Sequence, residues 1–183
     1  MPAFHVAVTG QITKGTVFSS DNLTLKYEWH CGRSYWTTVS GQSEGISHCC
    51  IKSPDDSGES IATWSLPVNT VFSSSSLHGW PRLVVILYSK DWFDRDVVVG
   101  YGTILVPLKS GTSTIRCHLF KPMSSSALQA VSSWFFGSLP QFSDPLLPAK
   151  NDHRELVRTS HNGWVEVSVN VVVKGFLDTG VTL

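Results

Sequence analysis

The sequence predicts an all-β fold: an antiparallel β-sandwich of about eight strands in two sheets, with one short helix. Valine and threonine are frequent, and in several stretches apolar and polar residues alternate. Gly, Pro or Ser-Asp clusters interrupt these stretches at short intervals, as turns do between strands. The 183 residues suffice for one packed core, and the sequence contains no internal repeat. We therefore expect residues 1–183 to form a single domain.

Strands are expected where residues that favour β-structure run between turn signals. The runs that meet this description are Phe4–Ile12, Leu23–Trp29, Ile61–Leu66, Val97–Val106 and Ser113–Phe120. A further run, Arg82–Ser89 (RLVVILYS), is apolar on both faces and follows Pro81. This pattern is typical of a central strand that begins after a fixed turn.

The most regular alternation lies in GWVEVSVNVVVKG, residues 163–175. One face of this predicted strand consists of valines, namely Val165, Val167, Val169, Val171 and Val173. Asn162-Gly163 at its start predicts a type I′ hairpin turn, because both residues tolerate a positive φ angle. Residues 154–161 are then expected to form the partner strand.

One segment departs from strand periodicity. After Ser124-Ser125-Ser126, the stretch ALQAVSSWFFG places apolar residues at helical spacing and stops at Gly137. The serines can cap the first turn. We expect one short helix near residues 126–136, followed by a proline-rich loop.

The charge and the cysteine content of the chain limit which classes of function are possible. Fourteen basic and fourteen acidic residues are spread without runs, so no broad field is available for nucleic acid. Neither a secretory leader nor an apolar stretch of about 20 residues is present, which predicts a cytoplasmic protein. The cysteines are too few for a disulfide scaffold and are expected to be reduced thiols. They are Cys31, Cys49, Cys50 and Cys117.

Catalytic and metal-binding patterns are weak. GQSEG at Gly41–Gly45 matches the elbow of α/β hydrolases, which requires a helix directly after the serine. Pro54 and a cluster of turn residues leave little room for that helix, so Ser43 is expected in a Gly-rich turn. Histidine and cysteine are neighbours at three places, but none shows Cys-x-x-Cys spacing. We expect no catalytic residue, no cofactor, no structural zinc and no small-molecule substrate.

One loop places charged and aromatic residues between two strands. The stretch LVVILYSKDWFDRDVVVGYGTILVPL resembles C2 domains, in which a strand enters a calcium-binding loop. The three acidic positions of the calcium-binding form correspond here to Ser89, Asp91 and Val97. The first calcium loop would lie around FSSDNL, and it offers Asp21 alone. The resemblance therefore implies a C2-like sandwich with degenerate calcium-loop positions.

Calcium takes about six to eight oxygen ligands, and its affinity follows the number of ligand charges. With two of the three acids replaced, we expect no metal at this loop. The alternative is a rebuilt loop in which Asp94 and Asp96 bind calcium weakly. The simpler interpretation is that these two acids only keep the turn hydrated.

Trp92 and Phe93 occupy the loop-tip positions that enter the membrane in lipid-binding C2 domains. Three acids outnumber two bases in this loop, which disfavours anionic lipid. Contact with a protein partner is therefore preferred, with membrane contact as the alternative, and both rings folded against the sandwich as a third interpretation. The predicted tip residues are Trp92, Phe93, Asp94 and Arg95. The other tryptophans considered, Trp29, Trp64, Trp80 and Trp164, are expected to fill the core.

Several further stretches are similar to the B9-domain family, a diverged C2 branch, from about Ala7 to Asp178. They are HGWPRLVV, GYGTILVP, EGIS, SSWFFGSLPQFSDP and VNVVVKGFLDTG. The resemblance implies a non-enzymatic component of the ciliary transition zone that assembles with other B9-domain proteins in the tectonic-like (Meckel syndrome) complex. It also implies a location at the basal body and cytoskeleton, and a role in ciliogenesis and the ciliary diffusion barrier. An open sheet edge would offer a second partner surface by strand addition.

Overall fold

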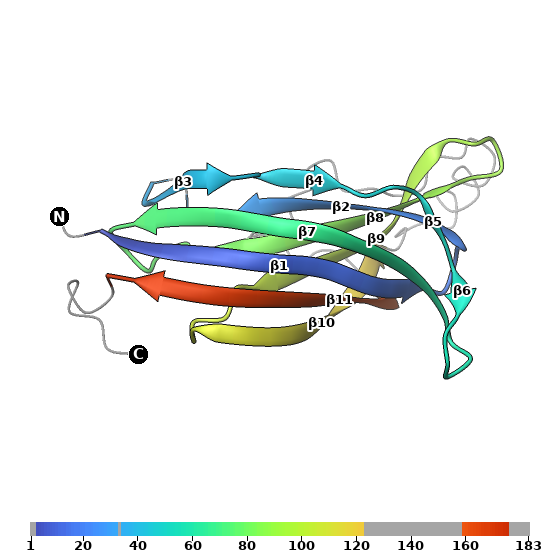
Figure 1. Ribbon diagram of the computed structural model, residues 1–183. Coiled ribbons are helices and arrows are strands. Elements are labelled where there is room, and N and C mark those ends of the chain that lie inside the picture. Colours follow the sequence, from blue (N-terminus) through green and yellow to red (C-terminus); the bar gives the residue numbers. More distant parts are fainter. Residues whose placement is uncertain (1–2, 33, 123–158, 176–183) are drawn as a thin grey trace.

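The computed structural model describes residues 3–32, 34–122 and 159–175. It is all-β and antiparallel, a curled sheet that forms a C2-like sandwich, as predicted (Figure 1). The helix expected near residues 126–136 and the loop after it lie outside the described residues. Eight of the described strands have six residues or more, and the three others are short.

The longer strands run antiparallel to their hydrogen-bonded neighbours along the length of the molecule (Figure 1). Their bounds are β1 (Phe4–Val17), β2 (Asn22–His30), β3 (Trp36–Gly41), β4 (Glu44–Ile46), β5 (Cys50–Ile51), β6 (Ser53–Pro54), β7 (Ser60–Ser74), β8 (Arg82–Lys90), β9 (Asp96–Leu105), β10 (Gly111–Pro122) and β11 (Thr159–Lys174). The predicted strands correspond to β1, β2 and β7 to β11. The short β3 to β6 were not predicted.

Hydrogen bonds between neighbouring strands connect the two layers of the sandwich into one continuous sheet. The strand order is β3-β7-β1-β11-β10-β9-β8-β2-β4. One layer contains β3, β7, β1, β11 and β10, and the other contains β9, β8, β2 and β4. At the turn between the layers, β10 and β9 share one residue pair, Phe120 with Tyr101. The two predicted sheets are therefore connected along one side.

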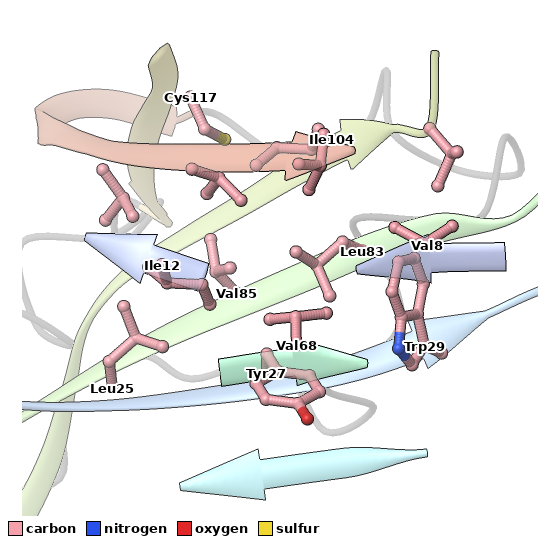
Figure 2. Packing of buried hydrophobic residues seen from close by; sticks show 14 of the residues in the cluster. Val8, Ile12, Leu25, Tyr27, Trp29, Val68, Leu83, Val85, Ile104 and Cys117 are labelled. Carbon is pink, nitrogen blue, oxygen red and sulfur yellow. The ribbon is translucent and has the colours of Figure 1, made fainter. Parts of the chain in front are cut away.

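The core lies between the layers. Figure 2 shows apolar side chains from both layers meeting there, such as Val8 and Ile12 of β1 with Leu25 and Val85 of the other layer. The four predicted valines from Val165 to Val171 are buried in this cluster, and Val173 packs at its margin. Burial of an aliphatic side chain contributes roughly 1.5–3 kcal/mol, so this face of β11 is a major source of stability.

β8 is buried on both faces, as predicted for a central strand. Leu83, Val85 and Leu87 face the main core. The opposite face belongs to a second cluster, which consists of Val84, Ile86, Val98 and Tyr101. This double burial explains why RLVVILYS lacks alternation.

The tryptophans expected in the core are buried or half-buried. Trp29 and Trp64 belong to the main cluster, and Trp80 packs against it. Trp164 is buried on the other face of β11, where the guanidinium of Arg116 lies 4.0 Å from its ring centroid. Its indole nitrogen donates to Glu59 Oε1 at 3.2 Å.

The hairpin turn predicted at Asn162-Gly163 is wrong, because both residues lie within β11. Asn162 is the extra residue of a β-bulge against β10, and its Nδ2 donates to the carbonyl of Val99 at 2.6 Å. Gly163 has a φ of 124° and lies so close to β1 that a Cβ there would be 2.0 Å from the carbonyl oxygen of Thr16. The same tolerance of positive φ thus serves a bulge between neighbouring strands.

Candidate functional site

The hairpin between β8 and β9 positions the loop that the sequence singled out. Lys90 and Asp96 form the last pair of the ladder, and Asp91 to Arg95 close the loop. The amide of Asp91 donates to the carbonyl of Arg95 at 3.0 Å, and the amide of Asp94 donates to the carbonyl of Asp91 at 3.1 Å. Asp94 has a φ of 59°, a left-handed conformation that aspartate tolerates. The hairpin extends beyond one end of the sandwich (Figure 1).

The carboxylate of Asp91 organises this loop from inside. Its Oδ1 accepts the amides of Phe93 at 2.8 Å and Arg95 at 2.9 Å. Its Oδ2 accepts Nε of Arg95 at 2.9 Å and pairs with Nη2 at 2.7 Å. The amide and guanidinium of Arg95, together with the amide of Phe93, lower the pKa of Asp91. The loop is therefore held in a defined conformation by hydrogen bonds among its own residues.

Lys90 neutralises the two remaining acids. Its Nζ lies 3.1 Å from Asp96 Oδ1 and 3.9 Å from Asp94 Oδ1, and it donates to the carbonyl of Asp94 at 3.1 Å. The hydrogen bond with Asp96 raises the pKa of Lys90. The acids suggested for a rebuilt calcium site thus have protein cations as partners.

The two aromatic residues at the tip are open to solvent. Trp92 is 96% exposed and Phe93 is 68% exposed, so neither ring is folded into the sandwich. The guanidinium of Arg95 lies 5.0 Å from the ring centroid of Phe93 and restricts it on one side. The loop consequently presents an apolar pair on a fixed base.

The degenerate calcium positions do not converge on a cation site. Ser89 and Val97 are buried, and Asp91 is occupied by Arg95. Asp21 pairs with Lys52 Nζ at 3.0 Å, and the same Nζ donates to the carbonyl of Val17 at 2.9 Å. Among the described residues, no three His, Cys, Asp or Glu side chains are grouped as metal ligands.

Sequence reasoning missed two apolar residues at the same end of the molecule. Phe18 follows β1 and is exposed, and Ile51 of β5, also exposed, pairs with Asn22 at the start of β2. Cys49, just before β5, lies close enough to Lys90 to affect its pKa. We call Phe18, Ile51, Trp92 and Phe93 the loop-end surface. The end of β1, the strand β5 and the β8–β9 hairpin, which carry or precede these residues, lie at one end of the sandwich (Figure 1).

Ser43 and the cysteines, which the sequence singled out as weak catalytic and metal-binding candidates, have structural positions in the fold. Ser43 lies in the turn between β3 and β4, where its carbonyl accepts the amide of Trp29 at 2.9 Å. The four cysteines are free thiols. Burial raises the pKa of Cys117 to about 11, so its thiol is protonated near neutral pH. No helix long and apolar enough to cross a membrane occurs in the described part of the chain.

Comparison with known proteins identifies the family to which this chain belongs. Residues 6–172 match the family model described as "Ciliary basal body-associated, B9 protein". The chain belongs to the B9-domain family. The description of this family associates its members with the ciliary basal body.

Relatives in the B9-domain family match over nearly the whole chain. B9 domain-containing protein 1 of Xenopus laevis is 39% identical over 97% of this chain and 88% of its own length. The human protein of the same name is 35% identical over 97% of this chain and 85% of its own length. B9 domain-containing protein 2 of Rattus norvegicus is 32% identical, with 97% and 98% covered.

Proposed function

We propose that this protein is a non-enzymatic scaffold, a single B9 domain over residues 1–183, that binds other B9-domain proteins in a heteromeric complex. Its place would be the ciliary transition zone, in the tectonic-like (Meckel syndrome) complex. There it would support ciliogenesis and the diffusion barrier at the base of the cilium. Membership of a family named for the ciliary basal body supports this location, together with a cytoplasmic and cytoskeletal setting.

The observation that carries the proposal is the exposed Trp92-Phe93 pair on a loop fixed by Asp91. Large aromatic side chains are the usual anchors of protein interfaces. A loop already ordered in the free protein loses little conformational entropy on binding. Trp92, Phe93, Asp94 and Arg95 would thus form the rigid tip of a docking surface.

Charge favours a protein partner over a lipid. The loop carries Lys90 and Arg95 against three acids, a formal charge of −1. Both cations are already paired within the loop. An anionic membrane surface attracts clusters of free basic residues, which this tip lacks. Insertion of Trp92 and Phe93 into a membrane is therefore the second candidate.

The partner contact is tested by replacing Trp92 and Phe93 together with alanine. Affinity for B9 domain-containing protein 2, measured by calorimetry, is expected to fall at least about tenfold, because two anchors are removed. The matched control is Val39→Ala with Leu77→Ala, a pair of exposed apolar residues outside the loop-end surface. If the variant without Trp92 and Phe93 kept the wild-type affinity, these two residues would not be part of the partner contact.

Sedimentation with vesicles of phosphatidylcholine and phosphatidylserine, with and without calcium, tests the lipid candidate. The protein is expected to stay in the supernatant in both conditions. Sedimentation that disappears when Trp92 and Phe93 become alanine would instead favour membrane docking.

A further inference from the structure

The sandwich is closed differently on its two sides. On one side, β3 pairs with β7, Gln42 donates to the carbonyl of Asn69, and β4 then pairs with β2. The segment from β3 to β4 therefore spans both layers. On the other side, β9 and β10 share only the pair of Tyr101 and Phe120 among the described residues. We call the gap between Gly102–Leu105 of β9 and Gly111–Leu119 of β10 the seam.

The seam stays open because the two strands cross rather than run together. Next to the paired residue Tyr101, a Cβ on Gly102 would lie 2.7 Å from Cys117 Sγ. Beyond the crossing, β10 pairs with β11 on one side over its whole length. On its other side, no ladder partner for Gly111–Leu119 occurs among the described residues. β10 thus offers a row of backbone donors and acceptors to an added strand.

The seam also contains a cavity and two unsatisfied hydroxyl groups. The cavity has a volume of about 360 Å³, and Thr103, Ile115, Arg116 and His118 are among its lining residues. Thr103 Oγ1 and, on β10, Ser113 Oγ are buried and have no hydrogen-bond partner among the described residues. Buried hydroxyl groups are nearly always hydrogen-bonded, so these two are available to polar groups of a partner.

The charged residues near the seam indicate what kind of segment would bind there. From Val97 to Pro122 the chain contains three basic residues and no acidic one. Arg116 and His118 line the cavity itself, and both are exposed. An extended segment with acidic side chains would complement this edge.

The other edge strand of this layer is less suited to strand addition. β3 is short, and its register shifts between Thr38 and Ser40, which is a device that discourages pairing at a sheet edge. β10 has no such shift before Leu119 and no proline before Pro122. The longer and more regular free edge is therefore that of β10.

We propose that the seam binds an extended, acidic segment of a partner protein, which adds to the edge of β10 as a further β-strand. The inference rests on the proposed scaffold function in so far as the partner is another B9-domain protein. It assigns a surface distinct from the Trp92-Phe93 tip.

A charge variant tests the seam with B9 domain-containing protein 2 as the probe. His118→Glu places an acid beside the incoming strand, and affinity is expected to fall about tenfold. The matched control is His5→Glu, because His5 is equally exposed on β1 but β1 is paired on both sides. Equal affinities of the two variants would overturn the proposal.

Thr103→Val removes the unsatisfied hydroxyl with little change in shape. Partner affinity should fall about fivefold, while the unfolding midpoint of the free chain stays the same or rises. If the Thr103 hydroxyl only stabilised the fold, Thr103→Val would lower the unfolding midpoint instead. Unchanged affinity would show that the partner does not use this hydroxyl and would count against the seam.

Hydrogen exchange on the full chain separates the seam from the scaffold function. With the B9 probe, amides of residues 111–119 should exchange more slowly while those of β3 do not change. A parallel experiment uses a peptide of alternating threonine and glutamate, compared with its threonine–lysine counterpart. Binding of the B9 protein without protection at β10 would refute the seam alone. Failure of every B9 probe, with glutamate-peptide protection intact, would refute the scaffold function alone.

Discussion

At the residue scale, Asp91 matters most for the candidate site. In a calcium-binding C2 loop this position would hold a metal ligand, whereas here its two oxygens accept from Phe93 and Arg95. An arginine of the same loop thus supplies the positive charge that orders the tip. The position of Asp91 was predictable from the resemblance, but its partner depended on the loop conformation.

The first prediction concerns Asp91→Asn. The pKa of Asp91 is lowered in the folded protein, so its contribution to loop order is complete above the pKa of the unfolded chain. That contribution is lost as pH falls through the lower, folded pKa. Exchange of the Phe93 and Arg95 amides should therefore stay slow into moderately acidic solution and then accelerate.

In the Asn variant these amides should exchange faster at neutral pH, with little dependence on acid titration. A wild-type loop that loosens already at the usual aspartate pKa would contradict the role given to Arg95.

The second prediction concerns Gly163→Ala. A side chain there would meet the carbonyl of Thr16 and would require a strained backbone angle. The expected loss of stability is about 2–4 kcal/mol in denaturant unfolding. Gly58→Ala is the control, since Gly58 also has a positive φ, of 81°, but has nothing within 4 Å of the added carbon. Equal losses for the two variants would mean that the close approach to β1 has no energetic weight.

At the element scale, Lys52 connects three parts of the loop end. It follows β5, and its amino group bonds the carbonyl of Val17 at the end of β1 and the carboxylate of Asp21 before β2. Its side chain is largely buried, which makes these contacts harder for water to replace. The turn between β1 and β2 is thereby held without a metal.

The third prediction is that Lys52→Met lowers the free energy of unfolding by about 1–3 kcal/mol, because the carbonyl of Val17 and the carboxylate of Asp21 lose a donor whose side chain is largely buried. Lys26→Met is the matched control. Lys26 also has a carboxylate partner, Glu44 at 2.8 Å, but the pair is on the surface and should be worth less than about 1 kcal/mol. Equal losses of stability in Lys52→Met and Lys26→Met would show that the burial of the Lys52 side chain has no energetic importance.

The long strands were predictable because their patterns are local. Alternation marked β11, and the doubly apolar run marked β8. β3 to β6 were missed because they are short and exist only through pairing with β2 and β7. Asn162-Gly163 was misinterpreted for the same reason, since the sequence around it does not show that β1 passes beside it.

At the scale of the whole molecule, the described acids at the loop end face lysine or arginine rather than one another. The fourth prediction is therefore that the melting temperature is the same in millimolar calcium and in chelator. A ligand that binds only the folded state raises this temperature in proportion to its affinity. A clear calcium-dependent rise that disappears in Asp21→Asn or Asp91→Asn would show a metal site after all.

The two proposed docking surfaces differ in how far they could be foreseen. Trp92 and Phe93 stood out in the sequence because aromatic residues seldom lie among loop acids. Phe18 and Ile51 did not, since only the fold brings their loops to the same end. The seam was beyond prediction, because it results from the angle at which β10 crosses β9.

The central claim is that this B9 domain works by docking to another B9-domain protein. The most direct measurement is the molar mass, by light scattering after gel filtration, of the chain co-expressed with B9 domain-containing protein 2. We expect a stable heteromeric species, and we expect less of it when Trp92 and Phe93 become alanine. A chain that elutes as a monomer with every B9-domain protein tried would contradict it.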